Sequence, residues 1–201
     1  FELLDYTTKN IFEILDSNVR KQHDKMSTLI AKAIEEIETA SQQTDGLLGV
    51  PSGFTALDRI TGGWQKSDLL ILAARPGMGK TALCLNIAEH VGVHVRRPVA
   101  IFSLEMSKEQ LVIRFLCSEA RVDSAKLRTG FLSREDWPIL TRAAGVLSEA
   151  PIYIDDTPAQ SALDIRAKAR RLQVELGDLA LIIVDYLQLM TPTSTKALGN
   201  P

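Results

Sequence analysis

The sequence is poor in the residues that build metal centres and disulfide frameworks. Its 201 residues include two cysteines, Cys84 and Cys117, and three histidines, His23, His90 and His94. The cysteines lie in apolar, helix-like surroundings without Cys-x-x-Cys spacing, and the histidines are scattered along the chain. We therefore expect neither a disulfide nor a metal cluster, and interpret both cysteines as reduced core residues of a cytoplasmic protein.

Neither sign of charge dominates, and long apolar runs are missing. The chain has 23 Lys and Arg against 25 Asp and Glu, a formal net charge of −2. This excludes a basic field over the whole domain, so a nucleic acid would have to be held by local loops or encircled by an oligomer. No apolar stretch approaches the roughly 20 residues of a membrane-spanning helix, so we expect no membrane partner. The hydrophobic content of 45% suits one sizeable globular core.

The chain opens with two stretches of helical periodicity, residues 7–20 and 26–40. The first stretch places five apolar residues near one side of a helix: Ile11, Phe12, Ile14, Leu15 and Val19. The second carries apolar residues at helical spacing from Met26 to Ala40. Both helices could pack on their own domain, or the first could dock on a neighbouring subunit. Periodicity alone favours packing on the same domain.

The rest of the chain alternates between apolar strands and helices. A loop rich in Gly, Pro and Ser comes first, with a helical turn at 55–60 and a tight turn at Gly62–Gly63. Predicted strands are 69–74, 99–104, 151–155 and 179–185, and predicted helices are 80–91, 107–120, 133–150 and 161–176. This alternation predicts an α/β fold with a mostly parallel sheet flanked by helices, preceded by the two amphipathic helices.

The sequence ARPGMGKT, residues 74–81, stands where a parallel sheet binds ligands, after a strand and at the start of a helix. Gly77 and Gly79 let the backbone amides curl around phosphate, Lys80 can reach the β- and γ-phosphates, and the Thr81 hydroxyl can hold Mg²⁺. Ala74 replaces the usual first glycine, which is sterically plausible if its φ stays negative. The predicted residues for binding ATP are Ala74, Arg75, Pro76, Gly77, Met78, Gly79, Lys80, Thr81 and Ala82.

Acidic residues follow the predicted strands at the same edge of the sheet. Asp185 ends the apolar strand 179–185 and is the expected carboxylate near Mg²⁺. Glu105 follows the second strand, where it could activate water or could serve the dipole of the next helix. Asp155 and Asp156 could support the site or simply form a turn.

Four motifs taken together resemble a known family. They are SGFTALDRITGGW, AARPGMGKTAL, FSLEMS and IIVDYLQLM, in this order within residues 46–190. The set resembles the RecA-like motor domain of the DnaB-type bacterial replicative helicases, in which Ala at position 74 is usual. The resemblance implies a RecA-like P-loop NTPase that uses ATP and Mg²⁺. It assigns Glu105 to activation of the attacking water, Lys80 to the phosphates, and Thr81 and Asp185 to the metal.

The resemblance also implies how the chain is organised. Residues 1–22 resemble the linker helix that packs on the adjacent protomer of a hexameric ring, which reverses the preference from periodicity. Residues 23–201 resemble the ATPase domain without its C-terminal part. The expected function is ATP-driven translocation on single-stranded DNA and unwinding at the replication fork. Primase and a helicase loader, the partners of the family in the primosome, are the expected protein partners.

Because such helicases continue with DNA-contacting loops, a sensor glutamine and a basic pair, we expect the chain to be a piece of a longer helicase. Its first residue, Phe1, agrees with this, and the isolated piece is expected to hydrolyse ATP slowly or not at all. Two alternatives stay open, a RecA-like ATPase of recombination or signalling and an inactive piece that serves assembly. The segments SLEMS and DYLQLM favour the helicase.

Overall fold

The computed structural model describes residues 25–42 and 47–192, which belong to two units, residues 1–46 and 47–201. The described part of the first unit is one helix, α2 (Met26–Gln42). Its apolar side chains are exposed, with Ile34 at 51% and Ile37 at 66%. The helix predicted at 26–40 is therefore confirmed, whereas the one predicted at 7–20 lies outside the described residues.

Three parallel strands form the sheet of the second unit, in the order β2-β1-β3. They are β1 (Val99–Ser103), β2 (Ile152–Asp155) and β3 (Leu181–Asp185). In the register of the pairing, Phe102 lies opposite Asp155 and Ser103 lies opposite Asp185. The carboxyl ends of all three strands therefore meet at one edge of the sheet, as predicted.

Helices follow the strands in the predicted alternation. They are α3 (Thr55–Thr61), α4 (Lys80–Glu89), α5 (Lys108–Ala120), α6 (Ser124–Thr129), α7 (Asp136–Ser148) and α8 (Ala162–Leu176). A π-helical turn, His90–His94, prolongs α4, and a 3₁₀ turn, Leu187–Leu189, follows β3. The short helix α6 was not predicted from the sequence.

Local capping sets several of these helix ends. Ser107 and Ser161 are the N-caps of α5 and α8, and both form capping boxes, with Gln110 and Asp164 respectively, which satisfy backbone amides at the helix start. In contrast, α7 begins later than the predicted start at Ser133. The Ser133 amide donates to the Asp136 carboxylate at 2.8 Å, which closes a turn ahead of the helix.

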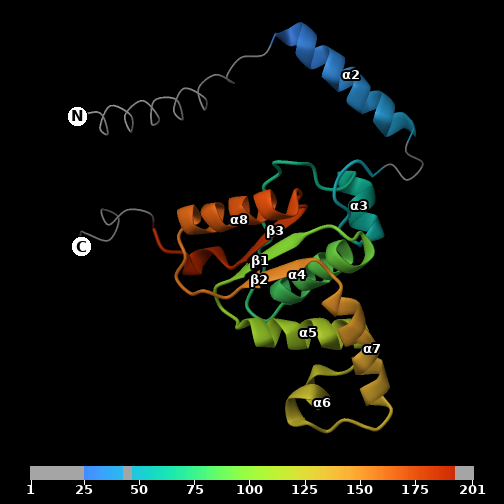
Figure 1. Ribbon diagram of the computed structural model, residues 1–201, viewed down its shortest axis with the longest axis vertical. Coiled ribbons are helices and arrows are strands. Elements are labelled where there is room, and N and C mark those ends of the chain that lie inside the picture. Colours follow the sequence, from blue (N-terminus) through green and yellow to red (C-terminus); the bar gives the residue numbers. More distant parts are fainter. Residues whose placement is uncertain (1–24, 43–46, 193–201) are drawn as a thin grey trace, which may run out of the picture. The chain divides into compact units, whose positions relative to one another are not determined.

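The strand β1 is buried on both faces and organises the core (Figure 1). Val99 and Ile101 pack with Leu85 of α4, Val91 of the π-helical turn and Leu111 of α5. On the opposite face, Ala100 and Phe102 pack with Ile165 and Ala169 of α8. The sheet is therefore a middle layer between α8 on one side and α4 with α5 on the other, the three-layer arrangement expected of an α/β fold.

The prediction of a buried strand at 69–74 is wrong for the described structure. The segment forms no strand, and Leu69 and Ile71 are 85% and 81% exposed. A run that is apolar on both sides indicates a strand covered on both faces, but a strand also needs a ladder partner. Among the described residues, the pairing of β3 extends to β1 alone, so residues 69–74 run beside no hydrogen-bonded neighbour.

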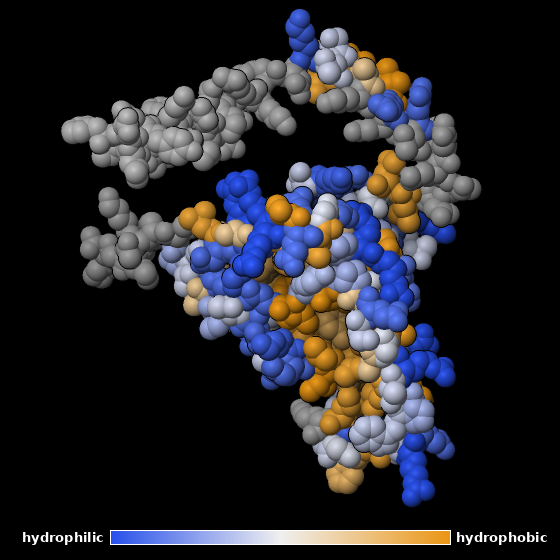
Figure 2. Space-filling model, viewed as in Figure 1, coloured by the Kyte–Doolittle hydropathy of each residue, from blue (hydrophilic) through white to orange (hydrophobic). Residues whose placement is uncertain are grey.

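Exposed apolar side chains also gather on α7 and in the loop before it. Phe131 is 81% exposed, Trp137 is 60% exposed and Ile139 is 47% exposed. Figure 2 shows hydrophobic surface in the lower half of the view, where α7 lies. In the described ranges, no helix is long and apolar enough to cross a membrane.

Candidate nucleotide site

The loop before α4 has the backbone shape that a phosphate cradle requires. Gly77 and Gly79 adopt φ angles of 76° and 88°, in the left-handed region that favours glycine. A Cβ at either position would meet no atom within 4 Å, so the space around the loop is open. The helix α4 begins at Lys80 with no side chain capping its first amides. Those amides and the positive end of the helix dipole can therefore receive an anion.

Three predicted site residues, Lys80, Thr81 and Asp185, come together at this helix start. The Lys80 Nζ atom lies 2.9 Å from the Asp185 Oδ1 atom, and the Thr81 hydroxyl donates to Asp185 Oδ2 at 2.6 Å. The Asp185 side chain is 8% exposed and the Lys80 side chain 25% exposed. Both carboxylate oxygens therefore have a partner, which offsets the cost of burying the charge at the tip of β3.

Glu105 lies two residues beyond the end of β1, at the same sheet edge as Asp185. The Leu104 amide donates to the Asp185 carbonyl oxygen at 2.8 Å, which ties the start of this loop to the end of β3. Glu105 itself is exposed. The fold thus places a solvent-facing carboxylate beyond the strand next to the one that ends in Asp185.

Asp155 and Asp156 are engaged in other contacts at the end of β2. Lys168 donates to the Asp155 carboxylate at 2.6 Å, and the Lys108 amide donates to Asp156 at 3.0 Å. Burial would raise the pKa of Asp155, but hydrogen bonds from Lys168 and Thr157 outweigh it and lower the pKa. These bonds hold the loop after β2 against α8 and α5, which supports the turn-forming alternative for both aspartates.

Cys84 lies one turn after Lys80 in α4. Burial raises the pKa of its thiol, and the nearby Asp185 carboxylate raises it further. Both cysteines are free and of intermediate burial. Among the described residues, no group of three or more His, Cys, Asp or Glu side chains could hold a metal ion. A Mg²⁺ ion would here depend on nucleotide oxygens, Thr81 and Asp185.

The sequence did not single out Tyr186, which the structure places directly at the site. The Lys80 Nζ atom lies 4.1 Å from the centroid of the Tyr186 ring. Its position next to Asp185 in the chain was the available signal. A cation–aromatic contact depends on where two side chains meet in space, however, and spacing in the sequence does not specify that.

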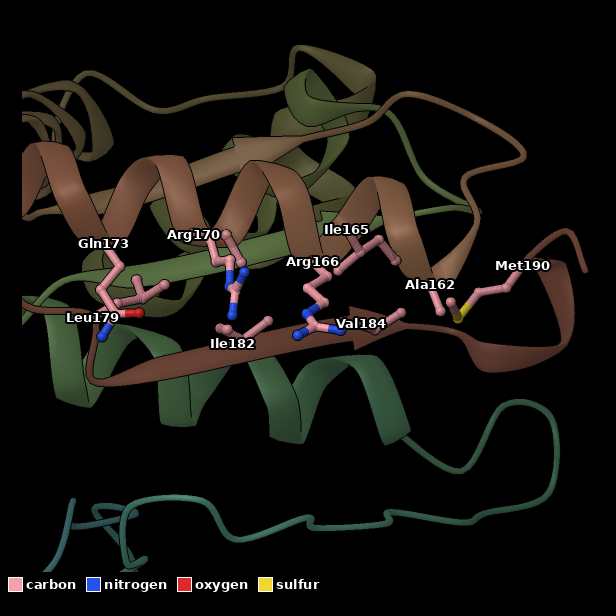
Figure 3. Close-up of a pocket in the computed structure, with 10 residues that line it drawn as sticks. Ala162, Ile165, Arg166, Arg170, Gln173, Leu179, Ile182, Val184 and Met190 are labelled. Atoms are coloured by element: carbon pink, nitrogen blue, oxygen red, sulfur yellow. The ribbon is translucent and has the colours of Figure 1, made fainter. Parts of the chain in front are cut away.

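A cavity of about 360 Å³ lies apart from this site, between α8 and β3. Figure 3 shows Arg166 and Arg170 reaching from α8 across the face of β3 toward Ile182 and Val184. The lining is mostly apolar, and Lys80, Thr81 and Asp185 do not contribute to it. Residues 74–79 of the phosphate loop are exposed, so the loop is an open surface site rather than an enclosed cavity.

The fold and the assembled residues agree with the comparison to known families. The family model described as the DnaB-like helicase C-terminal domain matches residues 49–199. The chain belongs to this DnaB-like family. The resemblance drawn from the four sequence motifs is thereby confirmed, and so is the RecA-like α/β fold.

Curated relatives of the DnaB-like family match nearly all of the chain. Replicative DNA helicase DnaB of Geobacillus stearothermophilus is 48% identical over 188 residues, and replicative DNA helicase DnaC of Bacillus subtilis is 46% identical over 189 residues. Each match covers 94% of this chain and 41% of the relative. The chain therefore spans about two fifths of the length of these relatives.

Solved structures give the same family. One, described as an ATPase domain, superimposes with a TM-score of 0.79 at 32% identity, covering 87% of this chain and 61% of that one. A DnaB-like replicative helicase, described with its interactions with primase, gives 0.75 at 30% identity and covers 94% of this chain and 45% of that one. The sheet between two layers of helices, with the phosphate loop before α4, is thus the arrangement found in DnaB-like ATPase domains.

Proposed function

We propose that the protein carrying this chain is an ATP-dependent replicative DNA helicase and that the chain supplies its motor domain. The observation that carries the proposal is the meeting of Lys80, Thr81 and Asp185 at the uncapped start of α4. Membership of the DnaB-like family supports unwinding of DNA as the work that hydrolysis drives. Replication also makes the cytoplasm the proposed location.

Each residue of the site has a role that its position supports. The backbone N–H groups of the loop 74–82, which Pro76 lacks, surround the phosphates. Lys80 leaves Asp185 to donate to the β- and γ-phosphate oxygens. Glu105, exposed at the adjoining strand end, accepts a proton from the attacking water. In the family, Glu of the corresponding stretch has this role, and the same assignment is proposed here.

Thr81 and Asp185 fit the requirements of Mg²⁺. A hydroxyl and a carboxylate are hard oxygen ligands, and Mg²⁺ in nucleotide sites typically takes one or two carboxylates with substrate phosphates and water. The bound ion would neutralise charge that develops on the phosphates during hydrolysis. Thr81 already donates to Asp185, which holds both oxygens on the side of the phosphate loop.

The proposed assembly is a homohexamer on single-stranded DNA, with primase and a helicase loader as further partners. A net charge of −2 is compatible with a ring that encircles DNA, because such a ring needs no basic field over each subunit. Docking of residues 7–20, part of the proposed linker region 1–22, on an adjacent motor domain (residues 23–201) remains a prediction. The exposed apolar side chains Phe131, Trp137 and Ile139 are of a kind that subunit contacts commonly bury.

ATP turnover, measured with and without single-stranded DNA, tests this function in the full-length protein. We expect turnover to rise with DNA. Lys80→Ala should lower the rate by at least about a hundredfold, since phosphate positioning and charge stabilisation dominate this chemistry. Glu105→Gln should slow hydrolysis while retaining nucleotide binding.

Three other outcomes would redirect the assignment. Turnover that ignores DNA would favour a signalling ATPase of the same fold. DNA-stimulated turnover without strand separation would favour a recombination ATPase. Nucleotide binding with no turnover under any condition would leave the chain a role in assembly only.

A further inference from the structure

The ammonium of Lys80 has two neighbours in the structure, and they differ in kind. On one side lies the Asp185 carboxylate, with its Oδ1 atom 2.9 Å from Nζ. On the other lies the ring of Tyr186, with its centroid 4.1 Å from the same nitrogen. The distance to the ring is well inside the roughly 6 Å at which a cation is attracted to an aromatic face.

These two neighbours respond differently to an incoming nucleotide. Asp185 carries a full charge that Thr81 already shares and that a hydrated cation would compete for. The Tyr186 ring attracts the ammonium through its quadrupole. Neither a metal ion nor a phosphate competes with the ammonium for the face of the ring. The ring contact is therefore the part of the Lys80 environment that can persist when the ammonium turns toward phosphate.

We propose that Tyr186 is a positioning residue, whose ring holds the Lys80 ammonium where it can pass from the Asp185 carboxylate to the nucleotide phosphates. Lysine is flexible, with four rotatable bonds to order before it can bind. A ring beneath the ammonium limits that freedom and keeps the ion pair with Asp185 from becoming the only stable arrangement. The proposal rests on the proposed ATP-binding function and adds a residue to it.

The aromatic face, rather than the phenol hydroxyl, carries this role. In the described part of the chain, no hydrogen bond is formed by the Tyr186 side-chain oxygen, while the ring faces the ammonium. Phenylalanine at this position should therefore keep the contact. Methionine, of similar bulk but without an aromatic face, should lose it.

The test compares equilibrium binding of Mg·ATP to the full-length protein and its variants. Tyr186→Met should weaken binding about three- to thirtyfold, the range that loss of a cation–aromatic contact allows. Tyr186→Phe should restore most of the affinity. Tyr153→Met, a matched change at a partly exposed tyrosine of β2, controls for general effects of removing an aromatic ring.

A double-mutant cycle separates positioning of Lys80 from a general structural effect. In a Lys80→Ala background, Tyr186→Met should leave the remaining affinity unchanged, because the cation that the ring holds is gone. A structural role would weaken binding equally in both backgrounds and would overturn the inference. Thermal melts identify a misfolded Met variant, in which case Tyr186→Leu takes its place in the same cycle.

The outcomes for the inference and for the proposed function are distinct. If wild-type protein binds Mg·ATP and Tyr186→Met binds it as tightly or more tightly, the inference alone is wrong. Such a result would mean that the ring holds Lys80 in a conformation of the empty site only. If wild-type protein fails to bind Mg·ATP at all, the proposed function falls and the inference falls with it.

Discussion

At the scale of single residues, the buried Asp185 carboxylate connects the phosphate loop to the sheet. It accepts from Thr81 and pairs with Lys80, so the loop and β3 are joined through one side chain. Sequence reasoning could find all three residues, because the glycine spacing and the strand-ending aspartate are local patterns. It could not find the ring contact of Tyr186, which depends on the path that the chain takes after β3.

A second buried acid, Glu89, lies at the end of α4 in a polar pocket of about 250 Å³. Its Oε2 atom is the one fully buried side-chain oxygen or nitrogen without a hydrogen-bond partner in the described residues. Burial raises the pKa of Glu89 to about 7, a hydrogen bond with Ser118 opposes the rise, and nearby Glu119 adds to it. Below about pH 7 this side chain is therefore mostly neutral in the folded protein.

The raised pKa of Glu89 makes folding stability depend on pH. Between the unfolded value of 4.5 and about 7, the folded state retains a proton that the unfolded state loses. Stability from this group is fully present below pH 4.5 and is lost as pH rises toward 7. Glu89→Gln, neutral at every pH, should therefore gain stability relative to wild type between pH 5 and pH 8, by up to about 3 kcal/mol.

Urea unfolding of both proteins at pH 5 and pH 8 measures this difference. Glu175→Gln, at an exposed position of α8, is the matched control and should shift both values little. A Glu89→Gln protein whose stability relative to wild type is the same at both pH values would contradict the account of Glu89.

At the scale of elements, the sequence predicted the helices that have local capping residues and the strands that have a strand to pair with. The helices α5 and α8 begin with the residue pairs of capping boxes, and the short apolar strands β2 and β3 each pair with β1. Residues 69–74 have the same apolar composition, but no strand pairs with them among the described residues. An apolar composition indicates that a segment prefers to be buried. A strand also needs a neighbouring strand to hydrogen-bond with, and the composition of the segment does not show which one.

Two glycines show how local geometry decides the effect of one methyl group. Gly145, exposed within α7, would place a Cβ in open space, so Gly145→Ala should stabilise by about 0.5–1 kcal/mol through helix propensity. A Cβ on Gly49 would collide with the backbone of Trp64, across the bridge between Val50 and Trp64. Gly49→Ala should therefore destabilise by about 1–3 kcal/mol.

Thermal and urea unfolding of the two alanine variants checks this pair. Stabilisation by Gly49→Ala, or a loss of stability in Gly145→Ala, would show that the backbone around these glycines differs from the structure. Because both changes are identical in chemistry, their opposite signs isolate the effect of position.

At the scale of the whole molecule, the residues of the proposed nucleotide site lie together on one edge of a RecA-like scaffold. The phosphate loop, Asp185 and Glu105 all lie at the carboxyl edge of the sheet, in the open rather than in a closed cavity. A site open in this way agrees with the proposal that ATP binds between protomers of a ring. The chain spans about two fifths of the length of its curated relatives. The motor activity is therefore proposed for the full-length protein.

Strand separation of a forked DNA duplex by the full-length protein tests the central claim most directly. The account predicts unwinding that requires ATP and Mg²⁺, stops with a non-hydrolysable ATP analogue, and is abolished by Lys80→Ala. Unwinding that persists in Lys80→Ala, or wild-type protein that hydrolyses ATP on the fork without separating its strands, would contradict it.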